Sequence, residues 1–150
     1  MNVLDQIVNH AKKISNKEHE RVYPGIPFEF SRACTPGDAV WQGDLGLVIV
    51  DKIPKDYVKV NNPTEINKKL VLGETDGARH CLDSLEGVVL YHPKEWNEES
   101  LQGPCFRLTK TRKVVHPTHG PVTIPAGFMI LCYYQREWDK ELKKEQRARD

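Results

Sequence analysis

Apolar and polar positions follow two different periods along this chain, one helical and one typical of strands. In residues 1–20 the apolar positions recur at i, i+3 and i+4, and lysines and asparagines fill the other face. This spacing predicts an amphipathic helix, which we expect to cover an apolar surface of the chain itself or of a partner. The apolar positions of this helix are Val3, Leu4, Ile7, Val8, Ala11 and Ile14.

Beyond residue 44 the chain carries short apolar runs, rich in β-branched and aromatic residues and separated by glycine or proline. Runs of this kind predict β-strands. The turn Pro125-Ala126-Gly127 lies between the last two runs and predicts that they form a hairpin. The expected strands are residues 45–51, 70–72, 80–82, 87–91, 104–109, 113–116, 122–124 and 128–135.

Two polar or turn-rich segments interrupt this pattern. Residues 23–44 contain several proline and glycine turn signals and predict a connector, which Phe28, Phe30 and Trp41 would pin to the core. Residues 55–69 are polar and predict an excursion from the sheet.

Short strands without a repeated βαβ pattern predict a mainly β fold, either a small β-barrel, a roll or a sandwich, with an N-terminal amphipathic helix. The chain has 150 residues, enough to bury a core as one domain. We expect that domain to comprise a helical arm (1–20), a β core (41–138) and a charged, solvated tail (139–150).

Composition narrows the class of protein. The formal net charge is +1, from 22 basic and 21 acidic residues, which argues against a dedicated nucleic-acid binder. The sequence lacks the run of about 20 apolar residues that a membrane span needs and has no secretory apolar region near its start. The four cysteines lack C-x2-C spacing. We expect reduced thiols in a cytoplasmic protein.

Histidines and carboxylates are the side chains that point to chemistry. Imidazole and carboxylate groups are the usual ligands of zinc, iron or manganese. His116 and His119 flank Pro117-Thr118, a spacing that suits a turn better than a helix face, so both rings could also be ordinary turn residues. His80 could equally make a structural hydrogen bond. The candidate cluster is Glu74, His80, His116, His119 and Glu137.

Other chemistries have weaker support. Adjacent strand residues point to opposite faces, which disfavours a catalytic pair of His80 and Cys81. Arg136 lies among Tyr133, Tyr134 and Trp138, aromatic side chains that could stack on bases or sugars or simply end a strand at the rim of the core. The chain has no G-x-S-x-G nucleophile elbow, phosphate-binding loop or dinucleotide fingerprint.

Five short motifs follow one another along residues 41–150. They are Gln42-Gly43-Asp44, Gly73-Glu74…Gly77…His80, His116…His119, Ile124-Pro125-Ala126-Gly127 and Gln135-Arg136-Glu137-Trp138. In this order they resemble the motifs of a group of short uncharacterised bacterial and phage proteins. Members of that group typically carry T-G-H-x-H in the second motif, whereas this chain keeps His80 and has Ala78 at the position of the first histidine.

The resemblance implies an accessory or structural protein of bacterial or phage origin, in the host cytoplasm or the virion. It adds weight to Glu74, His80, His119 and Glu137 as a cluster. Together with Arg136 these residues form the candidate pocket.

Two functions follow from these observations. The first is a non-enzymatic binding or assembly module that contacts a protein partner or its own copy through the N-terminal helix. The alternative is a metal-dependent, cupin-like β-barrel enzyme in which Glu74, His80, His119 and Glu137 hold a divalent metal ion.

Overall fold

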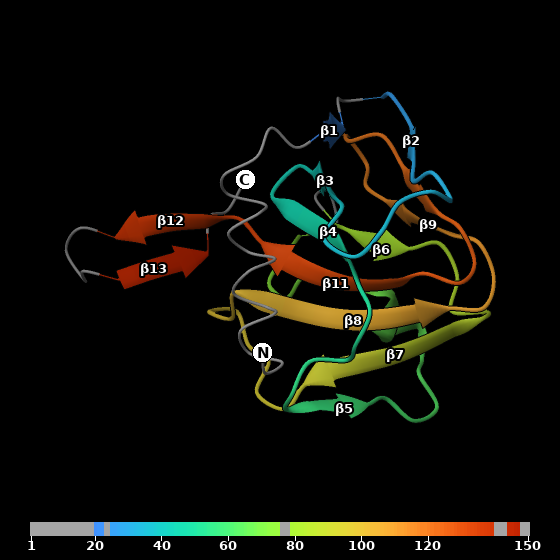
Figure 1. Ribbon diagram of the computed structural model, residues 1–150. Coiled ribbons are helices and arrows are strands. Elements are labelled where there is room, and N and C mark those ends of the chain that lie inside the picture. Colours follow the sequence, from blue (N-terminus) through green and yellow to red (C-terminus); the bar gives the residue numbers. More distant parts are fainter. Residues whose placement is uncertain (1–19, 23–24, 76–78, 140–143, 148–150) are drawn as a thin grey trace.

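The computed structural model describes residues 20–22, 25–75, 79–139 and 144–147, and its strands form two main sheets and one separate hairpin (Figure 1). Of residues 20–22, 137–139 and 144–146 only the backbone is described. The described part of the chain is mainly β, as the sequence predicts, and its one helical element is the short 3-10 helix η1 (Glu65–Lys68).

Seven strands form the larger sheet, and all neighbours run antiparallel except β1 and β3. The strand β4 lies inside this sheet, between β3 and β11; it reads LGLVIV and is buried at all six positions. A continuous apolar run of this kind is typical of a strand that is covered on both faces. In spatial order the strands are β1 (Glu20–Val22), β3 (Ala39–Gln42), β4 (Leu45–Val50), β11 (Met129–Tyr134), β8 (Gln102–Leu108), β7 (Val88–Pro93) and β5 (Tyr57–Lys59).

Four strands of two to four residues form the second sheet, in the order β2 (Phe28–Glu29), β10 (Val122–Ile124), β9 (Arg112–Val115) and β6 (Cys81–Leu82). Within the described residues no strand pairing joins an edge of this sheet to an edge of the larger one. The fold is therefore not a closed barrel, and that alternative from the sequence is wrong.

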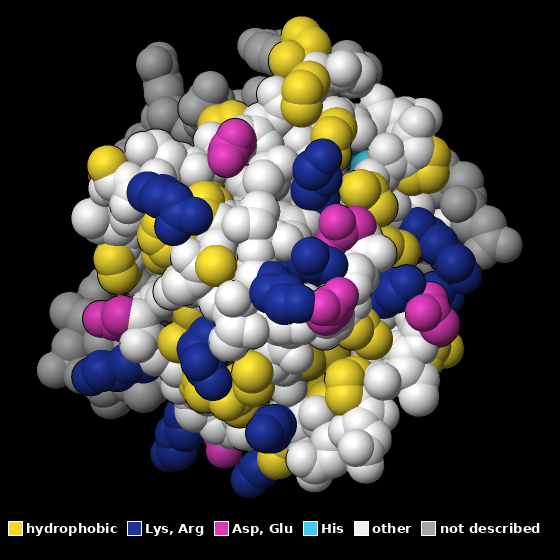
Figure 2. Space-filling model, turned by 90° about the vertical axis from the view of Figure 1, so that its right-hand side faces the viewer, with side chains coloured by type: hydrophobic (Ala, Val, Ile, Leu, Met, Phe, Trp, Pro, Cys, Tyr) yellow, Lys and Arg dark blue, Asp and Glu magenta, His cyan; other side chains and the backbone are white. Residues whose placement is uncertain are grey.

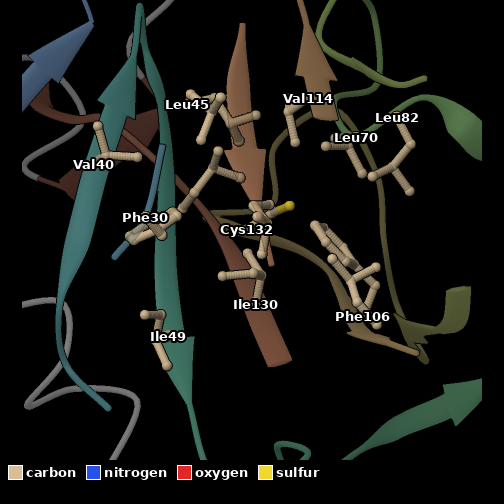
Figure 3. Close-up of a cluster of buried hydrophobic side chains, with 14 of the residues drawn as sticks. Phe30, Val40, Leu45, Ile49, Leu70, Leu82, Phe106, Val114, Ile130 and Cys132 are labelled. Atoms are coloured by element: carbon tan, nitrogen blue, oxygen red, sulfur yellow. The ribbon is translucent and has the colours of Figure 1, made fainter. Parts of the chain in front are cut away.

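One apolar layer receives side chains from both sheets (Figure 3). Phe106, Leu47 and Ile130 enter it from the larger sheet, while Leu82 and Val114 enter it from the smaller one. All five are almost completely buried. Each large apolar side chain buried in this way contributes about 1.5–3 kcal/mol, so this layer is the main stabilising feature of the fold.

Strand alternation gives the larger sheet a second apolar face. On β11, Ile130 and Cys132 point into the shared layer, whereas Leu131 and Tyr133 point away from it and pack with Trp41. Residues i and i+2 share a face of a strand, so two apolar clusters result from one continuous apolar sequence. The thiols of Cys105 and Cys132 are buried in these two clusters, as expected of core cysteines.

The predicted hairpin of residues 122–135 is wrong. Strand β10 pairs with β2 and β9 in the smaller sheet, and β11 pairs with β4 and β8 in the larger one. The turn at Pro125-Ala126-Gly127 carries the chain from one sheet to the other, held by a hydrogen bond from the Gly127 amide to the Leu108 carbonyl. A turn signal shows where the chain bends, and longer-range pairing decides which strands become neighbours.

Three further predictions about segments need correction. Residues 70–72 are not a strand, because the ladder beside them is a single bridge between Lys69 and Cys81. The predicted connector contains the strands β2 and β3, and the polar excursion contains β5 and η1. Leu70 is nevertheless fully buried, so the apolar pattern located a core residue without a regular strand around it.

The two ends of the chain differ from the prediction in different ways. Residues 1–19 of the predicted helix lie outside the described residues, and Glu20, the last residue of that prediction, begins β1. In the predicted solvated tail, β13 (Lys144–Arg147) pairs with β12 (Arg136–Asp139), and this hairpin extends from one side of the body (left in Figure 1). Arg147 is buried and its Nη2 donates to the Leu72 carbonyl.

The surface agrees with the near-neutral composition. Figure 2 shows basic and acidic side chains interspersed with apolar ones over one face, without a large area of a single charge. Within the described residues no helix is long and apolar enough to span a membrane.

Candidate metal centre

The turn between β3 and β4 presents two polar side chains at one end of the space between the sheets. Gln42 pairs with Leu45 across this hairpin, so only Gly43 and Asp44 form the turn. Gly43 has φ of +59°, a conformation that glycine adopts without strain. Strand alternation points Gln42 toward the smaller sheet, because its neighbour Trp41 packs on the opposite face.

The amide group of Gln42 is fixed by two hydrogen bonds. Its Nε2 donates to the carbonyls of Val114 at 3.0 Å and Gly120 at 2.9 Å. Gly120 can lie here because it lacks a side chain: a Cβ at this position would be 1.7 Å from the carbonyl oxygen of Ile26. The NH2 group therefore faces the smaller sheet, and the amide oxygen Oε1 faces the opposite direction.

That oxygen determines which nitrogen of His80 carries a proton. Nδ1 of His80 lies 2.8 Å from Oε1 of Gln42, and His80 is 1% exposed. An amide oxygen only accepts hydrogen bonds, so Nδ1 of His80 must be the donor. In the neutral imidazole the lone pair is then on Nε2, which points away from Gln42.

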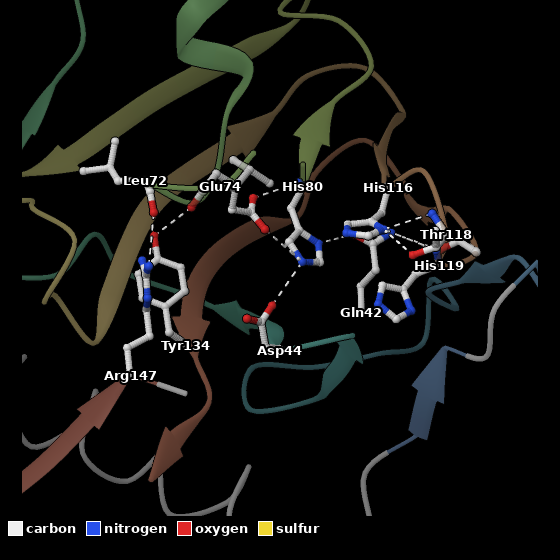
Figure 4. Close-up of polar contacts among 12 residues, drawn as sticks. Gln42, Asp44, Leu72, Glu74, His80, His116, Thr118, His119, Tyr134 and Arg147 are labelled. Atoms are coloured by element: carbon white, nitrogen blue, oxygen red, sulfur yellow. Dashed lines mark hydrogen bonds and ion pairs between the residues drawn. The ribbon is translucent and has the colours of Figure 1, made fainter. Parts of the chain in front are cut away.

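Nε2 of His80 faces two carboxylates (Figure 4). It lies 3.2 Å from Oδ1 of Asp44 and 3.6 Å from Oε2 of Glu74. Glu74 also holds the backbone of His80, because its Oε1 accepts the His80 amide at 2.9 Å. A lone pair that faces two anionic oxygens is unfavourable unless a cation lies between them, either a proton or a metal ion.

The pKa of Glu74 reflects this crowding. Burial raises the pKa of the Glu74 carboxyl, and the hydrogen bond from the His80 amide and the charge of His80 oppose that shift. The nearby Asp44 carboxylate raises the pKa further, while the Arg147 guanidinium lowers it. Desolvation and a second carboxylate together disfavour the anionic form of Glu74, so a cation at this position would be stabilised.

The spacing of these atoms also suits a metal ion. Two ligand atoms that each lie about 2.1 Å from a tetrahedral ion are about 3.4 Å apart. The two distances from Nε2 of His80, 3.2 and 3.6 Å, lie on either side of this separation. Among the described residues, the group whose candidate ligand atoms all lie within 4.8 Å of one another is Glu74, His80 and His116, and it does not include Asp44.

His116 and His119 lie beside this group on the turn after β9. The ring centroid of His116 is 4.4 Å from that of His80 and 4.5 Å from that of His119. Nδ1 of His116 accepts the backbone amides of Thr118 at 3.1 Å and His119 at 3.3 Å. This nitrogen closes the turn, so in the neutral ring the proton is on Nε2.

The structure brings four predicted site residues together and places a fifth elsewhere. Glu74, His80, His116 and His119 form one cluster, with 6.3 Å between the ring centroids of His80 and His119. The Arg136 guanidinium lies 4.8 Å from the ring centroid of Tyr133, an aromatic side chain on the outer face of the larger sheet.

The side chain of Glu137 lies outside the described part of the structure. Its predicted proximity to the histidines depended on a hairpin that does not form.

Sequence reasoning did not assign Gln42 and Asp44 to the site. Both belong to the motif Gln42-Gly43-Asp44, which the sequence marks as a turn. The available signal was the spacing of the amide and the carboxylate. Gln42 and Asp44 are two residues apart, and side chains at i and i+2 of an extended chain point to the same side.

The comparison with protein families covers this site. The model of one family, described as a domain of unknown function (DUF8820), matches residues 41–133. The chain belongs to this family. The DUF8820 match begins one residue before Gln42 and includes Asp44, Glu74, His80 and both turn histidines, whereas it ends before Arg136 and Glu137. Searches of curated proteins and of solved structures find no match.

Proposed function

We propose that this DUF8820 domain is a non-enzymatic binding module whose ligand is a divalent metal ion, held by Nε2 of His80 and the carboxylates of Asp44 and Glu74. One observation carries the proposal: the Gln42 amide fixes the proton of His80 on Nδ1 and so directs the Nε2 lone pair at two carboxylate oxygens.

The hydrogen bond between Gln42 and His80 is of the kind that orients metal-ligating histidines. A histidine that ligates metal through one nitrogen usually donates its other N–H to an acceptor, which fixes the ring orientation. Here the acceptor is itself fixed by the backbone carbonyls of Val114 and Gly120. His80 is therefore preorganised, and metal binding would not require reorientation of this ring.

The ligand set favours zinc, manganese or iron over magnesium or calcium. One imidazole with two carboxylates mixes nitrogen and oxygen ligands, whereas magnesium and calcium prefer oxygen alone. His116 is not one of the proposed ligands, because its Nδ1 accepts the backbone amides of the turn and the neutral ring then carries its proton on Nε2. The alternative from the sequence names a β-barrel, which the two sheets do not form in the described residues, and a metal-dependent enzyme at this site stays an untested prediction.

Metal titration of the purified full-length chain tests the proposal. After treatment with a chelator, the protein should bind one zinc or manganese ion per chain, measured by calorimetry and elemental analysis, and bind magnesium much more weakly. Asp44→Asn and Glu74→Gln should each weaken binding by more than the 10–100-fold that loss of an outer-shell partner typically costs, about 100-fold or more.

A matched control separates ligand loss from loss of negative charge. Glu95→Gln removes one exposed carboxylate far from His80 in sequence and should leave metal affinity within about twofold, because exposed charges are screened by salt. If Asp44→Asn and Glu95→Gln bind zinc with the same affinity as the wild-type chain, Asp44 is not a ligand and the proposed site is wrong.

The partner of such a module remains a prediction. A bacterial or phage accessory protein that contacts a protein partner or its own copy through residues 1–20 is compatible with a metal-dependent binding role. Light scattering of the full chain, with zinc and with chelator, measures whether the metal changes self-association.

A further inference from the structure

Strand β6 separates the metal centre from a cavity on its other side. Strand alternation places Arg79 and Cys81 on one face and His80 and Leu82 on the opposite face. His80 and Leu82 are each 1% exposed. Arg79 and Cys81, by contrast, line an open cavity of about 350 Å³.

The helix η1 and the residues after it supply the rest of this cavity. Lys69 is the bridge partner of Cys81, so both side chains lie on the same face of the chain. Lys68 and Ile66 complete the wall together with Glu65. Residues distant in sequence thus converge because the segment that ends at Lys69 runs antiparallel to β6.

Cationic side chains predominate among the described residues that line this cavity. Three of these side chains, Lys68, Lys69 and Arg79, are cationic and one, Glu65, is acidic, so the described lining residues sum to a charge of +2. Glu65 lies 2.7 Å from Lys68, but its side chain is 87% exposed, and a solvated carboxylate compensates a neighbouring charge only weakly.

A second surface cavity provides a reference. It measures about 440 Å³ and is lined by two lysines, Lys55 and Lys94, and two acids, Asp56 and Glu95. Its charges cancel, although it is the larger of the two. The excess of positive charge beside β6 is therefore not shared by this second cavity.

We propose that the cavity beside β6 binds the phosphate group of a small organic molecule, with Arg79 and Lys69 as the main charge partners. A planar guanidinium donates two parallel hydrogen bonds to phosphate, and an ammonium group adds a compact charge. The net charge of +2 matches a phosphate dianion better than a monoanionic carboxylate.

The size of the cavity limits the ligand. Small-molecule sites typically span about 300–1,000 Å³, so a cavity of about 350 Å³ suits a compact ligand. Ile66 is 68% exposed at the rim and offers an apolar surface for the carbon part of the ligand. This inference is independent of the metal centre, because none of the cavity residues is a proposed metal ligand.

Alkylation of Cys81 reports directly on this cavity. In a Cys34→Ser background, Cys81 is the one remaining thiol that is not buried, since Cys105 and Cys132 are. Anionic iodoacetate and neutral iodoacetamide share the same leaving group, so their rate ratio at one fixed pH measures local potential. In the presence of chelator and at low salt, Lys69→Gln and Arg79→Gln should each lower this ratio about threefold.

Phenyl phosphate is the binding probe. It should slow iodoacetamide at Cys81 saturably, by at least about tenfold at saturation, and protection should be lost in Lys69→Gln and Arg79→Gln and retained in Lys69→Arg and in Asp44→Asn. Lys110→Gln is the matched control, because Lys110 pairs with Glu86 outside the cavity and its loss should not change protection.

Each remaining outcome overturns the proposal. Absence of protection by phenyl phosphate, or equal protection in Lys69→Gln and the wild-type chain, would exclude the cavity as a phosphate site. Stronger protection by benzoate than by phenyl phosphate would exclude phosphate as the ligand class. If Lys69→Gln unfolds, seen as fast alkylation of buried Cys105, the comparison of Lys69→Arg with Arg79→Lys decides: protection absent from both contradicts the proposal.

Discussion

The apolar cluster around Phe106 and the polar cluster around His80 occupy two parts of the space between the same pair of sheets. Phe106 and Val114 fill the first part with apolar side chains in close contact. Gln42 and His80 fill the second with an amide and an imidazole that are each at least 99% buried. Alternation along the chain points all four side chains into this space. The two clusters therefore have the same strand geometry and differ in the chemistry of their side chains.

The two clusters depend on different stabilising interactions. An apolar side chain needs only neighbours that exclude water, and many residue types of similar volume can supply them. A buried polar group needs a partner for each donor and acceptor, since an unsatisfied group costs about 1–3 kcal/mol. Gln42 satisfies two carbonyls and one imidazole at once. The polar cluster is therefore more specific in residue type, and a cation would complete it.

The largest expected effect lies in the apolar cluster. Phe106→Ala should reduce the free energy of unfolding by about 3–5 kcal/mol, because it removes a fully buried ring and leaves a cavity. Denaturant unfolding measures this change. Val115→Ala, at an exposed position of β9, serves as the control and should stay within about 0.5 kcal/mol. A loss below 1 kcal/mol for Phe106→Ala would mean that the apolar cluster is not the main source of stability.

The next largest effect should come from Gln42. Gln42→Met keeps the volume but removes the donor to Val114 and Gly120 and the acceptor for His80, so we expect a loss of about 2–4 kcal/mol. The same variant should weaken zinc binding by about 10–100-fold, as loss of an outer-shell partner does. Unchanged stability and unchanged affinity in Gln42→Met would show that the polar cluster behaves like the apolar one.

A bound metal ion should stabilise the folded chain through the polar cluster and independently of the apolar one. At a free zinc concentration about 100 times the dissociation constant, the wild-type chain should gain about 2.7 kcal/mol in unfolding free energy. A Phe106→Leu variant should gain the same amount, because the ligands are intact, and Asp44→Asn should gain almost none. Thermal unfolding with zinc and with chelator measures both differences. An equal gain in Asp44→Asn would assign the metal to another site.

The smallest effect concerns His92, a histidine without the carboxylate partners of His80. Burial lowers the pKa of His92, and its Nε2 is a buried atom without a hydrogen-bond partner in the described part of the chain. The neutral ring is favoured in the folded state, so its contribution is present above the unfolded pKa of 6.5 and is lost as pH falls through the lower folded pKa.

Replacement of His92 should remove that pH dependence. His92→Leu should flatten the decline in melting temperature between about pH 6.5 and pH 5, an effect of about 1 kcal/mol or less for a partly exposed ring. Thermal unfolding of both proteins across this range measures the difference in slope. Parallel curves for the two proteins would show that another group causes the decline.

The sequence predicts the strands better than their arrangement. Runs such as LGLVIV locate β4, because β-branched and apolar residues fit a buried pleated surface. The separation of β10 from β11 was not predictable, since a turn at Pro125-Ala126-Gly127 is compatible with a hairpin and with a crossing between sheets. Strand partners are decided by contacts between residues distant in sequence, and local pattern carries no record of them.

The candidate site was predictable in part. Residue type and spacing identified Glu74, His80, His116 and His119, which the structure places together. The roles of Gln42 and Asp44 depend on hydrogen-bond directions across 38 and 36 residues of sequence, respectively, and residue type alone does not fix such directions. Arg136 was predicted to belong to the site because a hairpin of residues 122–135 would have placed it near His116 and His119. That hairpin does not form, and Arg136 lies against Tyr133 instead.

The turn at Gly43 belongs to the larger sheet, whereas His80 directly precedes β6 of the smaller one. A metal ion held between Asp44 and His80 would therefore act as a reversible cross-link between two layers, closing a loop of 36 residues. Cross-links that close loops of this length restrict the unfolded chain. They also slow separation of the layers when the bond is still intact at the unfolding barrier. The lifetime of the folded chain, and not only its equilibrium stability, would then depend on the metal supply of the cell.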